Sequence, residues 1–279
     1  MASIKKPLKG YSLNQSPFYK LKSRRKLASL FNLELKELER LVKRPDNYRV
    51  FIIGKGTNKH RVVEVPKIKL ERIHRRLFNL LRRIRTPEYL HSGVKGKSYI
   101  TNAKTHINAD RLITLDIQKF FPSTLGWHIF EFFCDEMKCS SDVAGLLTSI
   151  CTYDNHVPTG SCISQIIAFY AHKSMFDEID KLTKSLNLNM TCYVDDIAVS
   201  GNKANRKTLY LIRGIIKRRA LRSPSRKEHI YDIGKPKKVT GSIINKGTML
   251  LPNKKHKLIH KEIEVIRMTN NAEERLYLI

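Results

Sequence analysis

The sequence predicts a mixed α+β fold, because apolar runs rich in β-branched residues alternate irregularly with amphipathic helical stretches. Two of these runs, 112–117 and 191–201, are predicted strands that are interrupted by acidic residues. Two neighbouring carboxylates are costly in mid-strand, because at least one must face the buried side and lose its water. We therefore expect Asp195 and Asp196 at the tip of a hairpin, where cations can neutralise them.

The composition indicates a sizeable core and a polyanionic partner. The 279 residues, of which 41% are hydrophobic, suffice for one large domain or two modest ones. The formal net charge of +28 is spread along the chain, and nucleic acid is the expected partner of such a protein. A membrane is the competing partner, but no apolar run approaches the ~20 residues of a spanning helix. The first residues also lack the apolar core of a signal peptide.

The cysteines indicate a reducing compartment. Their number is odd, and no two of them have the Cys-x-x-Cys spacing of a metal or redox site. We expect reduced structural thiols in a cytoplasmic protein. The five residues are Cys134, Cys139, Cys151, Cys162 and Cys192.

The amino-terminal part predicts a helix followed by a hairpin. Residues 1–47 form a basic segment, and the leucine spacing over 26–43 predicts one helix there. In the stretch 48–66, two β-rich runs flank a connection of glycine, asparagine and lysine, which predicts a β-hairpin. On a polymerase scaffold its basic residues would lie over the template or the incoming triphosphate, whereas on another scaffold they would only be exposed turn residues. They are Lys55, Lys59 and Arg61.

The stretch 70–85 predicts an amphipathic helix with an almost entirely basic polar face. Glu71 is its only acid, whereas a face that merely contacts solvent usually mixes both signs of charge. We therefore expect phosphate contacts on this face. The arginines involved are Arg72, Arg75, Arg76, Arg82, Arg83 and Arg85.

A phosphate-binding loop is excluded in the next segment. The fragment 93–98 contains Gly-x-x-Gly-Lys-Ser, but the full loop pattern requires glycine at position 91, which is His91. We expect a basic loop that enters a short helix at Tyr99.

The remaining elements follow from periodicity and turn residues. They are helical core material over 127–151, a tight turn over 157–164, a helix over 165–179, a basic helix over 203–221, a charged loop over 222–238, a hairpin over 239–252 with its turn at 245–247, and a last helix over 253–268.

Three carboxylates are candidates for a metal site. Asp116 interrupts the first acidic strand, and Asp195 and Asp196 interrupt the second. Such a set could hold two Mg²⁺ ions, which stabilise the attacking and leaving oxygens of an in-line phosphoryl transfer. The alternative is that Asp195 and Asp196 occupy a solvated turn, and the apolar flanks on both sides count against it.

These motifs resemble those of bacterial retron reverse transcriptases. The hairpin tip Tyr193-Val194-Asp195-Asp196 resembles the Tyr-x-Asp-Asp box, and Asp116 with the following Phe120-Phe121-Pro122-Ser123 resembles the first metal-binding motif. The other similar elements are the (Leu/Val)-Pro-x-Gly turn at 157–161, the Asn-Ala-x-x-His element at 102–106 and the Val-Thr-Gly element at 239–241. The five motifs stand in the family's order and cover roughly residues 48–265.

The resemblance implies a right-hand polymerase with fingers, palm and a short helical thumb. The palm would be an antiparallel sheet that carries the three aspartates and packs on helices. The implied limits are 1–47 for the amino-terminal segment, 48–110 for the fingers, 111–245 for the palm with fingers helices near 127–156, and 246–279 for the primer-grip hairpin and a short or truncated thumb.

The resemblance also implies residue roles. Asp116, Asp195 and Asp196 would be catalytic and would bind two Mg²⁺ ions, with Mn²⁺ as a possible substitute. The dNTP would contact Arg61, Phe121 as the gate that excludes a ribose 2′-OH, Thr159, Gly160 and Lys227. The RNA and primer would contact Asn102, His106, Tyr193, Val239, Thr240, Gly241, Arg75, Arg76, Arg82 and Arg83.

The implied activity is RNA-directed DNA synthesis in a bacterial retron. The enzyme would copy part of a structured non-coding RNA, from a 2′-OH primer, into a short DNA that stays covalently joined to the RNA (msDNA). Its expected setting is cytoplasmic anti-phage defence, with an effector toxin as partner and a higher-order ribonucleoprotein assembly. The alternatives are a defence-associated reverse transcriptase that makes untemplated or repetitive DNA, and a ribonucleoprotein scaffold that sequesters a toxic effector.

The sequence departs from the family pattern at three places. Cys162-Ile163-Ser164-Gln165 replaces the usual proline-containing continuation of the turn, and Arg226-Lys227-Glu228 lacks the usual Lys-Thr ending. Few residues follow Gly241, so we expect a short thumb completed by RNA or a partner, or an incomplete chain.

Overall fold

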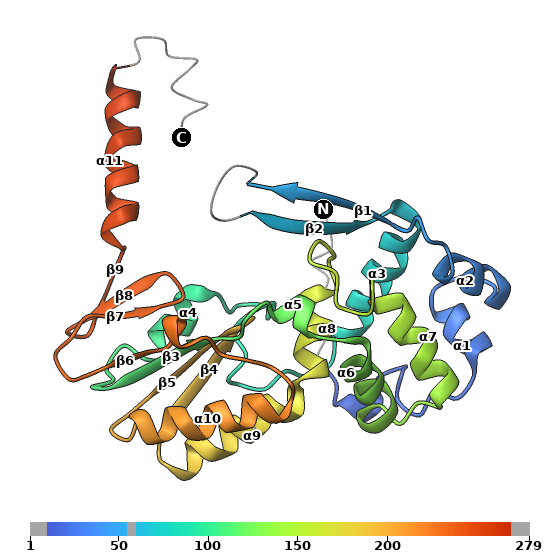
Figure 1. Cartoon of the computed structure of the whole chain (residues 1–279), viewed down its shortest axis with the longest axis horizontal. Helices are drawn as coiled ribbons and strands as arrows, with labels where there is room; N and C mark the ends of the chain where they lie inside the picture. Colours follow the sequence, from blue (N-terminus) through green and yellow to red (C-terminus); the bar gives the residue numbers. More distant parts are fainter. Residues whose placement is uncertain (1–9, 55–59, 269–279) are drawn as a thin grey trace, which may run out of the picture. The chain divides into compact units, whose positions relative to one another are not determined.

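The computed structural model describes residues 10–54 and 60–268 (Figure 1). Helices and antiparallel sheets are both present, which confirms the α+β prediction. The chain forms two compact units. The first contains the chain up to Glu88 with Ile117–Lys181 and Leu211–Pro224, and the second contains Tyr89–Asp116, Leu182–Tyr210 and the chain from Ser225 onward.

The first unit is mainly helical. Its strands β1 (Tyr48–Ile53) and β2 (Arg61–Pro66) form one antiparallel hairpin. Its helices are α1 (Arg24–Leu30), α2 (Leu35–Val42), α3 (Ile68–Leu81), α5 (Phe120–Ser123), α6 (Gly126–Glu131), α7 (Ser141–Cys151), α8 (Ser164–Ala171) and most of α9 (Lys173–Ser185), with a 3₁₀ turn at Leu13–Gln15 and a π-helical turn at Phe132–Glu136.

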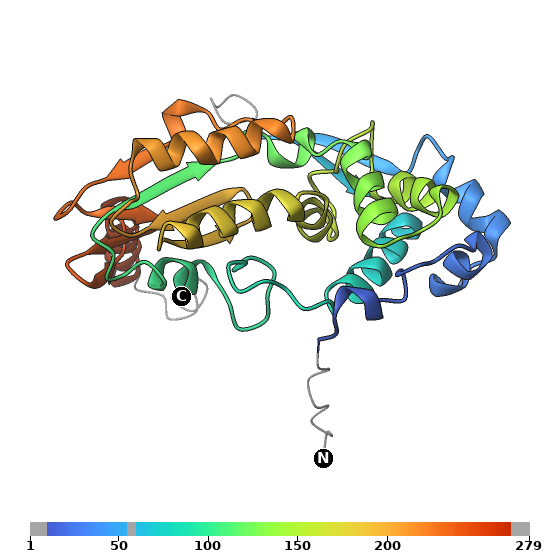
Figure 2. The same cartoon turned by 90° about the horizontal axis from the view of Figure 1, so that it is seen from below.

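The prediction of one helix over 26–43 is wrong. The structure has two helices, because Asn32 adopts a left-handed conformation with φ of 57°. Asparagine tolerates this conformation better than most residues, and it ends helices in this way. The Leu33 amide closes the turn by donating to the Ala28 carbonyl at 3.1 Å. Both helices pack against α7 (Figures 1 and 2).

The predicted helix over 70–85 is confirmed as α3, but it begins two residues earlier and ends at Leu81. Its apolar stripe is buried, and Leu77 and Leu81 have no exposed surface. Arg82 is the C-cap, so Arg83 and Arg85 lie beyond the helix. The last helical turn that was predicted for this helix, which would have carried these two arginines, is therefore absent.

The predicted hairpin over 48–66 is confirmed. Tyr48 pairs with Pro66 at one end and Ile53 with Arg61 at the other. The predicted basic tip, with Lys55 and Lys59, lies outside the described residues.

The predicted helix over 165–179 is interrupted at His172. This residue is the C-cap of α8, with φ of −116° and ψ of 14°, and α9 begins directly after it. The buried His172 ring lies next to Thr124 Oγ1, at 3.1 Å from Nε2, and packs on Phe120. Tertiary contacts of one side chain therefore divide a stretch that is helical by composition.

The second unit contains a four-stranded antiparallel sheet in the order β4-β5-β3-β6. Its strands are β3 (Leu112–Asp116), β4 (Asn189–Tyr193), β5 (Asp196–Ser200) and β6 (His229–Tyr231). The central pair runs from Leu112 opposite Ser200 to Asp116 opposite Asp196. The unit also contains α4 (Tyr99–Lys104), a 3₁₀ turn at Ser225–Lys227, α11 (Asn253–Met268) and the first residues of α10 (Arg206–Arg218).

Strand β6 corrects the prediction of a loop over 222–238. Its three residues pair with β3, from Leu112 opposite Tyr231 to Thr114 opposite His229. A three-residue strand is too short to show an alternating pattern, so only its tertiary pairing identifies it.

A second, three-stranded sheet follows. It consists of β7 (Lys237–Val239), β8 (Ser242–Asn245) and β9 (Thr248–Leu250). The predicted turn at 245–247 is confirmed, since Lys246 and Gly247 join β8 to β9 with positive φ, as two-residue hairpin turns require. Strand β7 was not predicted as a separate strand, and it reaches β8 through a turn at Thr240 and Gly241, also with positive φ.

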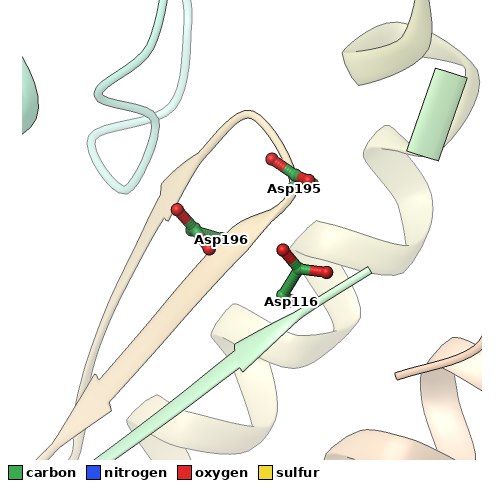
Figure 3. Close-up of side chains that lie close together, drawn as sticks. All are labelled: Asp116, Asp195 and Asp196. Atoms are coloured by element: carbon green, nitrogen blue, oxygen red, sulfur yellow. The ribbon is translucent and has the colours of Figure 1, made fainter. Parts of the chain in front are cut away.

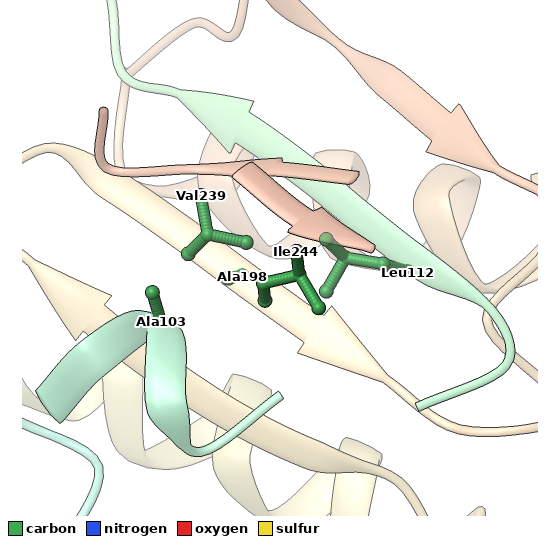
Figure 4. Close-up of a cluster of buried hydrophobic side chains, with 5 residues drawn as sticks. All are labelled: Ala103, Leu112, Ala198, Val239 and Ile244. Carbon is green, nitrogen blue, oxygen red and sulfur yellow. The ribbon is translucent and has the colours of Figure 1, made fainter. Parts of the chain in front are cut away.

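The small sheet and α4 pack on the same face of the four-stranded sheet. Figure 4 shows the contact, in which Ala103 of α4 and Val239 and Ile244 of the small sheet meet Leu112 and Ala198. All five side chains are at most 3% exposed. This cluster fixes the segments 102–106 and 239–241 against the strands that carry the aspartates.

Two negative findings concern the described chain. No helix in the two described ranges is long and apolar enough to span a bilayer. All five cysteines, each of which is described, are free thiols, and only Cys162 is exposed.

Candidate functional site

The Asp195–Asp196 motif occupies a tight hairpin turn. Tyr193 pairs with Asp196, so Val194 and Asp195 alone connect β4 to β5. Val194 has φ of 59°, a conformation that a β-branched residue rarely adopts. Such strain persists only where the surroundings enforce it, and it is frequent at functional sites.

The chain segment 89–92 holds this turn in place. The Cys192 amide donates to the Tyr89 carbonyl at 2.7 Å, and the His91 amide donates to the Cys192 carbonyl at 2.9 Å. The Ser92 hydroxyl accepts from the Val194 amide at 2.9 Å. The sequence indicated only a loop from residue 91 onward, and no local pattern marks these residues as supports of the turn.

The strand register brings the third aspartate to the same place. Asp116 is the last residue of β3 and lies directly opposite Asp196 on β5. One carboxylate oxygen from each of Asp116, Asp195 and Asp196 lies within 4.8 Å of the others (Figure 3). All three side chains are half-buried.

The three negative charges are unfavourable without cations. Burial, together with the charges of Asp195 and Asp116, raises the pKa of Asp196 to about 6. Lys227 and Lys238 oppose this shift, but the net effect of the surroundings still disfavours the carboxylate. Carboxylate oxygens at this spacing are the donor set that Mg²⁺ prefers, so the residues fit a divalent-cation site.

Lys227 contacts the triad directly. Its Nζ lies 2.6 Å from Asp116 Oδ1. Asp116 is mostly shielded, with 16% of its side chain exposed, whereas Lys227 is half exposed at 47%. The sequence predicted a dNTP contact for Lys227, and the structure places it beside the carboxylates, on the 3₁₀ turn that precedes β6.

A pocket of about 420 Å³ opens beside Asp116 and Asp196. Several predicted site residues line it, namely Asn102, Tyr193, Lys227, Val239, Thr240 and Gly241. The lining also includes three residues with basic side chains that were not among the predicted site residues. They are Arg226, His229 and Lys238. The only sequence signal for these three residues was their position close to the short motifs at 226–228 and 239–241.

Asn102 and Thr240 join the two retron-type elements. The Asn102 amide nitrogen Nδ2 donates to Thr240 Oγ1 at 3.2 Å, and this hydroxyl donates to the Tyr99 carbonyl at 3.1 Å. The elements at 102–106 and 239–241 are therefore hydrogen-bonded to each other, although more than 130 residues separate them in the sequence.

His106 lies in the core and not on the pocket wall. Its ring bridges two strands, with Nδ1 at 2.7 Å from Ser200 Oγ and Nε2 at 2.8 Å from Thr191 Oγ1. Burial lowers the pKa of His106 to about 4. His106 has no exposed surface and Val239 only 1%, so their contribution to RNA binding would be to hold neighbouring residues in place.

Three of the four predicted dNTP residues of the first unit lie on or against β2. Arg61 is the exposed first residue of this strand. Thr159 donates through Oγ1 to the Val62 carbonyl at 2.9 Å, and the Gly160 amide donates to the Glu64 carbonyl at 3.1 Å. Phe121 lies in α5, half-buried, with its ring 5.9 Å from that of Phe120.

The predicted phosphate-binding arginines also make contacts within the protein. Arg75 pairs with Glu71 on the preceding turn of α3, and Arg76 Nε donates to the Leu30 carbonyl at 2.9 Å. Arg82 lies over the Phe78 ring and Arg83 over the Tyr11 ring. Arg75, Arg76 and Arg82 remain exposed, whereas Arg83 is half-buried.

Comparisons with known proteins agree with the motifs. No protein-family model matches the chain. The chain is 30% identical to the retron Se72 reverse transcriptase of Salmonella heidelberg over 84% of its own length and 64% of the relative's. It is 26% identical to the retron Ec86 reverse transcriptase of Escherichia coli, over 81% and 72% of the two chains. With the retron Ec48 reverse transcriptase of Escherichia coli the identity is 25%, over 93% and 67%.

The match to the Se72 protein spans less than two thirds of that relative's length. Within the matched part, similarity to several retron proteins extends over most of this chain. By sequence, the chain is similar to retron-type reverse transcriptases over most of its length.

Proposed function

We propose that this protein is the RNA-directed DNA polymerase of a bacterial retron. It would copy part of a structured non-coding RNA into a short DNA that stays joined to the RNA, and it would act in the cytoplasm in anti-phage defence. The observation that carries the proposal is the convergence of Asp116, Asp195 and Asp196 beside a basic pocket. The names of the relatives support the same reaction.

The proposed architecture is a right hand. The four-stranded sheet would be the palm, the β1–β2 hairpin would belong to the fingers, and the small sheet would grip the primer. Helix α11 would begin the thumb. The domain limits proposed from the resemblance are 1–47, 48–110, 111–245 and 246–279.

The aspartates would hold two Mg²⁺ ions, or Mn²⁺ in their place. Bound there, the ions would supply activation of the primer hydroxyl and charge neutralisation of the leaving pyrophosphate. Asp116 and Asp196 lie opposite each other on paired strands, and this pairing fixes the spacing of their two carboxylates. Lys227 and Lys238 bring positive charge to the same pocket, where they would bind the phosphates of the nucleotide or primer.

The nucleotide would be selected by the first unit. Arg61 would contact the triphosphate, and Phe121 would exclude a ribose 2′-OH. Thr159 and Gly160 would line the dNTP pocket. The RNA would contact the exposed arginines of α3 and the junction of Asn102 with Thr240, and an effector protein and a larger ribonucleoprotein would complete the assembly.

The deciding experiment is dNTP incorporation by the purified ribonucleoprotein with Mg²⁺. We expect incorporation by the wild type and its loss in Asp195→Asn/Asp196→Asn. Asp232→Asn is the matched control, because Asp232 lies in the same unit and pairs only loosely with Arg111, at 3.7 Å. Equal incorporation by the wild type and the double variant would refute the proposal.

Sequencing the DNA product separates the retron from the other candidates. A retron should yield one short, defined cDNA that is joined to its RNA. Untemplated or repetitive DNA would favour a defence-associated polymerase of another kind. A scaffold that sequesters an effector is favoured by the net charge of +28, and it would retain its partner protein in the double aspartate variant.

A further inference from the structure

Glu64 is a buried acid whose carboxylate faces a histidine. It lies in β2 between valines and is 6% exposed. Within the described ranges, the only ion-pair partner found for it is His156, whose Nε2 lies 3.1 Å from Oε1 and 3.2 Å from Oε2. A buried carboxylate is costly unless it is paired and hydrogen-bonded, so this pair calls for an explanation.

The Glu64 carboxylate also binds the turn at 157–161. Its Oε2 accepts from the Thr159 amide at 3.1 Å. The backbone of Glu64 adds two further bonds, since its amide donates to Thr159 Oγ1 at 3.2 Å and its carbonyl accepts from the Gly160 amide at 3.1 Å. One residue of β2 thus makes three hydrogen bonds to a turn that lies 95 residues away in the sequence.

The turn approaches β2 as closely as the backbone allows. A Cβ added to Gly160 would lie 2.8 Å from the Glu64 carbonyl oxygen and 2.9 Å from the side chains of Val63 and Val65. These distances are shorter than real Cβ contacts. Glycine is therefore required here by close approach, and a small shift of the turn would change the contact.

His156 is itself held rigidly. Its backbone pairs with Tyr153 across a two-residue turn, with mutual amide–carbonyl distances of 2.9 and 3.0 Å. Its Nδ1 lies 3.0 Å from the Asp154 carbonyl oxygen, and its Nε2 faces the Glu64 carboxylate. Both ring nitrogens therefore lie within hydrogen-bond distance of oxygen atoms, one of the backbone and one of Glu64.

We propose that Glu64 and His156 are positioning residues, which form a buried hydrogen-bonded pair that fixes Thr159 and Gly160 against β2 for dNTP binding. The inference rests on the proposed polymerase function. Without the carboxylate, the Thr159 amide loses an acceptor and the His156 ring loses its hydrogen-bond partner. The turn at 157–161 would then move relative to Arg61, which lies on β2. The nucleotide would bind less tightly as a result.

The predicted effect falls on KM for the dNTP more than on kcat. A displacement of about 1 Å in a binding element can cost up to about 100-fold in activity, so we expect Glu64→Ala to raise KM by about tenfold or more. Glu64→Gln should raise KM less, because the amide oxygen can still accept from the Thr159 amide. His156→Gln should resemble Glu64→Gln.

The control is Asp46→Ala. Asp46 lies just before β1 on the same hairpin, is exposed, and pairs with Lys67 and Arg44. Its ion pairs are exposed, and none of those found in the described ranges involves the turn at 157–161, so the KM of this variant should equal that of the wild type. Steady-state incorporation on the full chain with its RNA gives both constants for each variant.

Hydrogen exchange supplies a readout that needs no activity. The Thr159 and Gly160 amides should exchange faster in Glu64→Gln and His156→Gln than in the wild type or Asp46→Ala. If KM and exchange in these variants match the wild type, the inference is overturned. If Glu64→Ala does not fold, the two glutamine variants decide. An inactive wild type would count against the polymerase proposal, whereas the exchange result would still decide the role of the pair.

Discussion

Asp116 and Asp196 face each other across neighbouring strands, in the arrangement that is least favourable for two like charges. Asp195 adds a third carboxylate within 4.8 Å. The fold maintains this crowding although it raises the pKa of Asp196 to about 6, with burial as the largest cause. A site that is electrostatically unfavourable by itself is expected where a cation is to be bound.

Asp196→Asn should therefore raise the stability of the protein and lower its activity. Removing one charge relieves the repulsion, so the metal-free protein should gain a few tenths to about 1 kcal/mol in unfolding free energy near neutral pH. Incorporation of dNTP should fall by about 10³-fold, because the site loses one ligand of the cations that would neutralise developing charge. Urea unfolding and primer extension measure the two effects, and a variant that is both less stable and fully active would contradict this account.

His106 predicts a pH dependence of stability. Burial lowers its pKa to about 4 from the ordinary value of 6.5, so the unfolded chain takes up the proton more readily than the folded one. The stabilising contribution is present above pH 6.5 and is lost as the pH falls toward 4. One such group changes the unfolding free energy by at most about 1.4 kcal/mol per pH unit.

The variant His106→Gln isolates this contribution. It should show a shallower decline in unfolding free energy between pH 6.5 and 4 than the wild type, although it is less stable at neutral pH. Denaturant titrations at several pH values give the comparison. Parallel pH profiles for the two proteins would show that His106 is not responsible.

At the scale of elements, the turn between β7 and β8 depends on side-chain contacts. Thr240 has φ of 43°, which is unfavourable for a β-branched residue, and Gly241 follows with φ of 84°. The Thr240 hydroxyl bonds both Asn102 of α4 and the Tyr99 carbonyl. These bonds hold a strained residue in place, and they attach the small sheet to α4.

Thr240→Val should therefore destabilise the protein by about 1–3 kcal/mol, because the buried Asn102 amide loses its acceptor while the shape of the side chain is kept. Thr248→Val is the matched control. Its hydroxyl bonds only the Asn245 carbonyl in an exposed turn, and its loss should cost less than about 0.5 kcal/mol. Thermal and urea unfolding test the difference, and equal losses would mean that the α4 contact contributes nothing.

For the molecule as a whole, the formal net charge of +28 is the dominant property. Exposed arginines such as Arg72 and Arg76 on α3 contribute to this charge, as do the lysines near the triad. Binding of a structured RNA should therefore release many counterions. The strength of binding should then depend strongly on salt.

We expect RNA affinity to fall by about 10³–10⁵-fold between 50 and 200 mM salt if six to ten phosphates are neutralised. The combined variant Arg75→Gln/Arg76→Gln/Arg82→Gln should show a smaller slope of log affinity against log salt. Asp195→Asn/Asp196→Asn should keep the slope of the wild type. Filter binding or anisotropy over a salt series is the measurement, and an unchanged slope in the arginine variant would exclude α3 from the RNA interface.

Local patterns predicted the elements whose signals are continuous. The hairpins at 48–66 and 245–247, the stripe of α3 and the start of α4 at Tyr99 all follow from periodicity or turn residues. The errors occur where a single residue ends an element, as Asn32 and His172 do, or where a strand is as short as β6. In each case a tertiary contact or one backbone conformation overrides the local pattern.

By itself, the sequence determined that two strands carry acids, that the chain is strongly basic, and that its motifs resemble those of retron-type reverse transcriptases. Only the tertiary structure decided that Asp116 lies opposite Asp196, that Lys227 contacts Asp116, and that Glu64 and His156 meet. These contacts join residues about 80 to 110 positions apart. Strand register and packing set such distances, and neither is written in any local stretch of the chain.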